Sequence, residues 1–154
     1  MKTSLLVRIF FTFIVSFLTV AVNAQSTTAT IGVVNNKEGV ITNQSEAIRV
    51  LKGGLSAQAV VTRAWIELSP TENKYYLIGQ ISNDPISGKA VQLHQNGSEI
   101  YAAMGTGIQV TCNGYNCGTC YPNIKGGKAR CVCTDPNPGT GSRCDMSTTV
   151  TIGW

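Results

Sequence analysis

Residues 57–81 of the chain read AQAVVTRAWIELSPTENKYYLIGQI, and two hydrophobic periodicities meet in this stretch. In its first half, six apolar side chains recur at the spacing of an amphipathic helix: Ala57, Val60, Val61, Ala64, Trp65 and Leu68. Ser56 is placed to cap such a helix, and Pro70 follows its end. The pattern therefore predicts a helix over residues 57–68.

A β-strand is the alternative for the same residues. One face of that strand would then carry Val60, Thr62, Ala64, Ile66 and Leu68. Val61 and Trp65 would lie on the opposite face. We favour the helix because all six of its inward positions are apolar.

Beyond this segment the periodicity changes to two. Residues 75–81 (YYLIGQI) form a strand candidate. Asn96-Gly97, placed between residues 90–95 and 98–103, is a strong signal for a tight β-hairpin, because its residues tolerate the positive φ angles of such turns. We therefore expect antiparallel strands in this half of the chain.

Earlier in the chain, short apolar runs at 31–34 and 40–42 indicate two more strands around a glycine-containing loop. Asn43 and Glu46 have the spacing of a capping box, which predicts a short helix at 44–52. Together these elements predict an α+β fold, in which one or two helices pack on an antiparallel β-meander.

The first 24 residues have the composition of a secretory signal peptide. Lys2 and Arg8 precede and flank the start of an apolar run at 9–22, and small residues at Val22-Asn23-Ala24 suit a signal peptidase. We expect cleavage before Gln25 and no transmembrane segment in the mature chain. The protein is then exported to the medium, the cell surface or the periplasm.

All six cysteines lie in the last third of the chain: Cys112, Cys117, Cys120, Cys131, Cys133 and Cys144. An even number of clustered cysteines in an exported chain predicts three disulfides. Frequent glycine and asparagine predict a disulfide-rich irregular region, and the alternation of Val150, Ile152 and Trp154 predicts a final short strand. The expected organisation is a signal peptide (1–24), an α+β core domain (25–111) and a disulfide-stapled region that packs on it (112–154).

The charge of the chain gives no indication of nucleic-acid binding. The sequence has 12 basic and 8 acidic residues, and loss of two basic residues with the signal peptide leaves a small positive excess. Basic residues and tyrosines are concentrated in the stapled region, where we predict a binding surface: Tyr115, Tyr121, Lys125, Lys128 and Arg130. Rigid basic loops that carry tyrosines suit a protein partner or an anionic cell-surface glycan.

Two further functions are possible from the residues alone. A small secreted hydrolase would use Glu99 or His94, although the chain has no GxSxG, HExxH or P-loop motif. An iron–sulfur or metal carrier would use Cys112, Cys117 and Cys120, whose spacing is that of ligands to a two-iron cluster. The leading hypothesis is a non-enzymatic binding protein with no catalytic residue, no metal and no cofactor.

Overall fold

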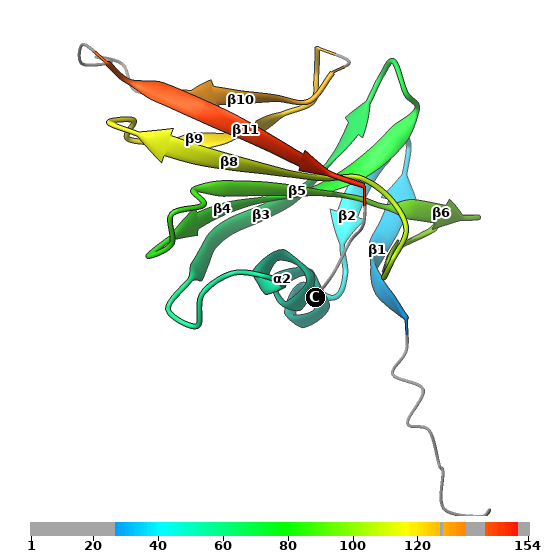
Figure 1. The fold of residues 1–154 in the computed structure, drawn as a ribbon. Coiled ribbons are helices and arrows are strands. Elements are labelled where there is room, and N and C mark those ends of the chain that lie inside the picture. Colours follow the sequence, from blue (N-terminus) through cyan, green and yellow to red (C-terminus); the bar gives the residue numbers. More distant parts are fainter. Residues whose placement is uncertain (1–26, 127, 135–140, 151–154) are drawn as a thin grey trace, which may run out of the picture.

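The computed structural model describes residues 27–126, 128–134 and 141–150. The predicted signal peptide lies outside these residues, as do Ile152 and Trp154 of the predicted final strand. The described chain is mostly antiparallel β-sheet with one short helix (Figure 1). No helix within it is long and apolar enough to cross a bilayer.

The strands form two sheets and one separate hairpin. The large sheet has five strands, in the order β11 (Arg143–Thr149), β8 (Gln109–Tyr115), β5 (Gly88–Gln92), β4 (Lys74–Ser82) and β3 (Val60–Ser69). The small sheet has four strands, in the order β2 (Glu38–Ile41), β1 (Thr28–Asn35), β7 (Glu99–Ala103) and β6 (His94–Asn96). β9 (Cys120–Asn123) and β10 (Arg130–Cys133) form the stapled hairpin. All neighbouring strands are antiparallel.

The large sheet is the middle layer, and its central strands β4 and β5 are buried on both faces. On β4, Tyr75 and Leu77 enter a core that is shared with the small sheet and with helix α2 (Gln44–Lys52). Tyr76 and Ile78, which alternate with them, enter a second core under the stapled hairpin. The unbroken apolar run of β4 follows from this position, since a strand covered on both faces needs no polar side. The three layers are visible in Figure 1.

Helix α2 has the bounds that its capping signals predicted. The Asn43 side chain accepts a hydrogen bond from the backbone N–H of Glu46 at 3.3 Å, which satisfies a free donor of the first turn. The buried face of the helix consists of Ala47, Val50 and Leu51. Leu51 sits directly on Gly79 of β4, where a Cβ would lie 2.8 Å from its side chain. A glycine at this position therefore lets the helix approach the sheet.

A buried lysine closes the other end of this helix. Lys89 of β5 is fully buried, and its Nζ donates to the carbonyl oxygens of Gly53 at 2.6 Å and Val50 at 3.3 Å. The free carbonyls at a helix C-terminus favour a positive charge. Burial lowers the pKa of Lys89 from 10.5 to about 8, because the charged form loses its hydration.

The predicted second helix is wrong, because residues 60–69 form strand β3. A β-bulge lies between Val61 and Arg63, where the pairing with β4 shifts by one residue. The extra residue, Thr62, turns Val61 to the same face as Ala64. Two inward residues are thereby separated by three positions, which is the spacing of a helix. The bulge in a strand therefore produced the apparent helical period.

The stapled region is more regular than the predicted irregular one. β8 and β11 are strands of the large sheet, and β9 and β10 pair with each other. Two glycines lie where the hairpin packs on the sheet. A Cβ on Gly114 of β8 would lie 2.9 Å from Cβ of Cys120, and a Cβ on Gly88 of β5 would lie 2.6 Å from Cα of Tyr121. Glycine here permits close packing of the hairpin on the sheet. The boundary predicted at 111/112 falls inside β8, and the division into two domains stays a prediction.

The predicted hairpin around Asn96-Gly97 is confirmed. Asn96 of β6 pairs with Glu99 of β7, and Gly97 in the turn has a φ of +60°. The preceding strand β5 belongs to the large sheet, so the chain passes from one sheet to the other at Leu93.

Candidate functional site

Two disulfides fasten the hairpin to the large sheet, and a third ties it to the loop that precedes it. Cys131 of β10 bonds to Cys112 of β8, and Cys120 of β9 bonds to Cys144 of β11. A third bond joins Cys133 of β10 to Cys117 in the loop before β9. The prediction of three disulfides is confirmed, and such a set indicates an oxidising, extracellular environment. Both hairpin strands are therefore covalently fixed to the layer beneath them.

The same bonds remove the support for an iron–sulfur cluster. Cys112, Cys117 and Cys120 are each in a disulfide, and no described cysteine is free. The sulfurs of Cys112, Cys120 and Cys144 lie within 4.8 Å of one another because two disulfides are neighbours under the hairpin. A metal would need these sulfurs as thiolates. The spacing that suggested cluster ligands is thus accounted for by the disulfide framework.

The turn of the hairpin gathers the three predicted cations around one shallow depression, the basic hollow. Its volume is about 470 Å³, and its walls are Asn123, Lys125, Gly126, Lys128, Arg130 and Val132. Asn123 and Arg130 are cross-strand partners and so share a face of the hairpin. The Asn123 side chain also accepts a hydrogen bond from the backbone N–H of Lys125 at 3.1 Å, which shapes the turn.

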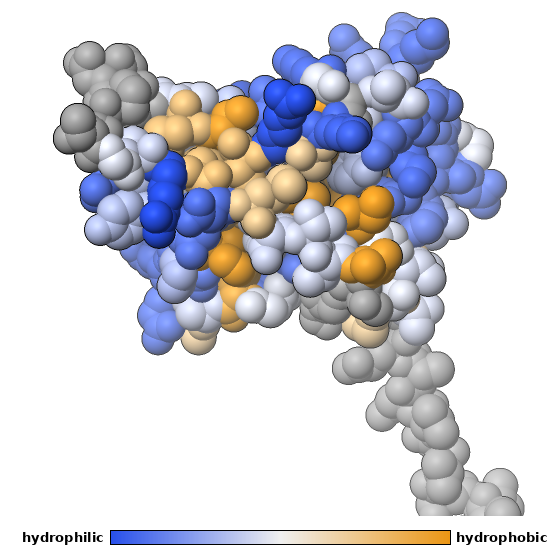
Figure 2. Space-filling view, turned by 45° about the horizontal axis from the view of Figure 1, so that its top comes forward, coloured by the Kyte–Doolittle hydropathy of each residue, from blue (hydrophilic) through white to orange (hydrophobic). Residues whose placement is uncertain are grey.

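The walls of the basic hollow carry positive charges and no negative charge. Lys125, Lys128 and Arg130 are all exposed, and none of the six wall residues is acidic. Figure 2 brings the hairpin side forward and shows a hydrophobic band with hydrophilic residues on both flanks. A fixed group of cations beside apolar surface can attract an anionic partner and also bury part of it.

Tyr121 lies next to the basic hollow and anchors the hairpin. It pairs across the hairpin with Val132, which is one of the walls. Its ring and the ring of Trp65 form a T-shaped pair with a centroid distance of 5.8 Å, and the Arg63 guanidinium lies 5.1 Å from the Trp65 ring. Sequence reasoning missed this aromatic pair because it placed Trp65 on a helix rather than on β3.

Tyr115 is not part of the basic hollow. It ends β8, before the loop that leads into β9, whereas the predicted lysines follow the other end of β9. The residue is 58% exposed, and the centroid of its ring lies 5.2 Å from Cζ of Arg143. The five predicted binding residues therefore divide into a group of four near the hairpin turn and an isolated tyrosine.

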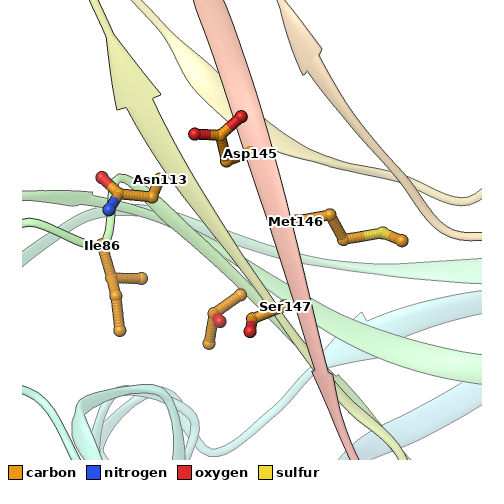
Figure 3. Close-up of a pocket in the computed structure, with 6 residues that line it drawn as sticks. Ile86, Asn113, Asp145, Met146 and Ser147 are labelled. Carbon is orange, nitrogen blue, oxygen red and sulfur yellow. The ribbon is translucent and has the colours of Figure 1, made fainter.

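A second hollow of about 340 Å³ lies on the outer strands of the large sheet (Figure 3). Its walls are Ile86, Thr111, Asn113, Asp145, Met146 and Ser147. Sequence reasoning did not find it, because its polar residues come from β8 and β11, which are far apart in the chain and carry no motif. The pairing of these strands alone brings the residues together.

The two candidate hydrolase residues already have structural partners. The His94 ring stacks on Tyr101 at 5.6 Å, and its Nε2 lies 3.4 Å from Oγ1 of Thr106. Glu99 is exposed and accepts a hydrogen bond from the Thr30 hydroxyl at 2.6 Å. Neither residue lines either hollow. The contacts of His94 and Glu99 give no support to a catalytic pair.

Comparisons of the chain with protein-family models, with curated proteins and with solved structures found no match. Function is therefore inferred from the side chains that the fold brings together.

Proposed function

We propose that this is an exported, non-enzymatic protein that binds an anionic partner through the basic hollow. The partner is a cell-surface glycan or a protein that presents carboxylate, sulfate or phosphate groups. The observation that carries the proposal is that Lys125, Lys128 and Arg130 line one depression without an acidic residue among its walls.

The three cations complement one another chemically. The planar guanidinium of Arg130 suits two-pronged hydrogen bonding to an oxyanion, whereas the two lysines add mobile point charges. The Asn123 side chain adds polar hydrogen-bonding capacity at the same face. All three charges are exposed, so we expect binding that weakens as salt is added.

The disulfides support this proposal through rigidity. Ordering a flexible loop on binding costs free energy, and a loop that is already fixed avoids much of that cost. The hairpin is bonded to β8 and β11, so the positions of its strands are set before any partner arrives. The charged turn is then presented by a rigid base.

The test replaces Lys125, Lys128 and Arg130 with serine and measures retention on an immobilised sulfated polysaccharide over a salt gradient. A matched control replaces Lys37, Lys52 and Lys74, which are exposed elsewhere and remove the same charge. We expect the hollow variant to lose at least tenfold in affinity with unchanged thermal stability, and the control to keep most of its binding. Equal losses in both variants would reduce the effect to net charge and refute the proposal, as would full retention by the hollow variant.

A further inference from the structure

The outer two strands of the large sheet carry a polar strip that the proposed function does not use. In the register of β8 and β11, three pairs of residues lie directly opposite each other: Tyr115 with Arg143, Asn113 with Asp145, and Thr111 with Ser147. Cross-strand partners share a face, and residues two apart on a strand also share it. All six side chains therefore belong to one face of the sheet.

This face is the one opposite the stapled hairpin. Thr111 pairs with Lys89, whose side chain reaches the carbonyls of helix α2. Cys112, the next residue, has the opposite direction and bonds to the hairpin. The polar strip and the basic hollow are thus on opposite sides of the large sheet, and a ligand of one does not touch the other.

The middle of the strip is the second hollow. Figure 3 shows Asn113, Asp145 and Ser147 around the same space, with Ile86 at its side and the Met146 side chain directed away. Ile86 comes from the connection between β4 and β5 and supplies an apolar wall. The hollow therefore combines an amide, a carboxylate and hydroxyls with one hydrophobic surface.

The polar groups of the hollow are available for a ligand. Within the described part of the chain, the side chains of Asn113, Thr111 and Ser147 make no hydrogen bond. The Asp145 carboxylate lies 3.1 Å from Nε of Arg143, so the single acid of the hollow is balanced by a neighbouring cation. The strip thus offers many hydrogen-bonding groups and no net charge.

We infer that this strip binds a neutral glycan. Amide, carboxylate and hydroxyl groups on one face can donate to and accept from the adjacent hydroxyls of a sugar. The exposed ring of Tyr115 stands at the end of the same strip, where it can pack against the apolar face of a sugar ring. The absence of net charge along the strip favours a neutral ligand over the anionic one proposed for the basic hollow.

The experiment titrates the oxidised protein with short oligosaccharides of glucose, of mannose and of N-acetylglucosamine, and follows backbone amide NMR signals. We expect saturable shifts confined to β8, β11 and the β4–β5 connection with at least one of the three probes. The Asn113→Ala/Asp145→Ala variant should bind that probe at least tenfold more weakly. The matched control is Thr30→Ala/Glu99→Ala, which removes a polar contact from the small sheet and should bind normally.

A second variant keeps the test informative if the first is unstable. Ser147→Tyr places a bulky side chain in the hollow at an exposed position and should abolish binding without unfolding the sheet. The inference is overturned if none of the three probes gives saturable shifts, if they shift only hairpin residues, or if both variants bind normally. A different binding mode would also overturn the inference. In that case an extended peptide that pairs with the edge of β11 would displace the probe, and both variants would still bind the probe normally.

The two proposed sites can be tested independently of each other. The serine variant of the basic hollow should keep neutral oligosaccharide binding, and the Asn113→Ala/Asp145→Ala variant should keep its retention on the sulfated polysaccharide. Loss of only one activity in each variant supports two sites, whereas loss of both activities in either variant contradicts their independence.

Discussion

Replacing Lys89 with methionine should change how the stability of the protein depends on pH. Lys89 is fully buried, and its pKa is about 8 in the folded protein, against 10.5 for an unperturbed lysine. Between these two values the unfolded chain binds a proton that the folded protein has released. The free energy of unfolding therefore rises with pH in this window.

The size of the effect follows from the two pKa values. Between pH 7.5 and pH 10, a single group with these values adds about 2 kcal/mol to the free energy of unfolding. The window ends near pH 10 because burial and the Glu72 carboxylate raise the pKa of Tyr76. The unfolded chain loses the Tyr76 proton first at higher pH, so that residue then lowers stability.

The assay is urea unfolding of the oxidised protein at several pH values from 7.5 to 10. The wild type and the control Lys74→Met, which changes an exposed residue, should share the rise in stability. Lys89→Met should lack about 2 kcal/mol of it. If the free energy of unfolding rose in parallel with pH for all three proteins, Lys89 would have the same pKa in the folded and unfolded states. That result would refute the reasoning from burial.

Three other perturbations test the framework. Cys117→Ser/Cys133→Ser removes a disulfide that closes a loop with a sequence separation of 16, and should lower the free energy of unfolding in urea by about 3 kcal/mol. A loss below about 1 kcal/mol would contradict a stabilising role for this disulfide. Gly88→Ala should cost about 2 kcal/mol in the same assay because its Cβ would meet the backbone of Tyr121, whereas Gly126→Ala, with open space around it, should be nearly neutral. The intact mass of the exported protein should correspond to a chain that starts at Gln25 and is lighter than its reduced form by about 2 Da per bridge; retention of residues 1–24 would contradict the predicted signal cleavage.

The elements that sequence reasoning located correctly are those with local signals. Asn43 and Glu46 act within one helical turn, and Asn96-Gly97 acts within one β-turn. Each signal depends on the chemistry of adjacent residues, so it needs no knowledge of the rest of the fold. The helix at 44–52 and the hairpin before Glu99 were therefore predictable.

Strand β3 was not predictable in the same way, because its bulge is set by pairing with β4. Without knowledge of where Thr62 is unpaired, the inward residues Val61 and Ala64 follow a helical spacing. The prediction of an irregular C-terminal region was wrong for a related reason. The glycines of this region permit close contacts such as that of Gly114 with Cys120, although the composition alone indicates loops.

The two candidate sites also differ in whether neighbouring residues or distant strands form them. Lys125, Lys128 and Arg130 are near neighbours in the chain, so one turn brings them together and the sequence indicates their grouping. Asn113 and Asp145 come from β8 and β11, and only the strand register places them opposite each other. The second hollow could therefore be found only from the structure.

The bond between Cys120 and Cys144 has a consequence for how the protein behaves at high concentration. β11 is one of the two edge strands of the large sheet, and an edge strand is a segment that neighbouring molecules can exchange in domain swapping. Because β11 is covalently joined to the hairpin through Cys144, it cannot leave its own sheet while the bond is intact. At high concentration, molecules can therefore contact one another at this strand without exchanging it, and each copy keeps the strand pairing with which it folded.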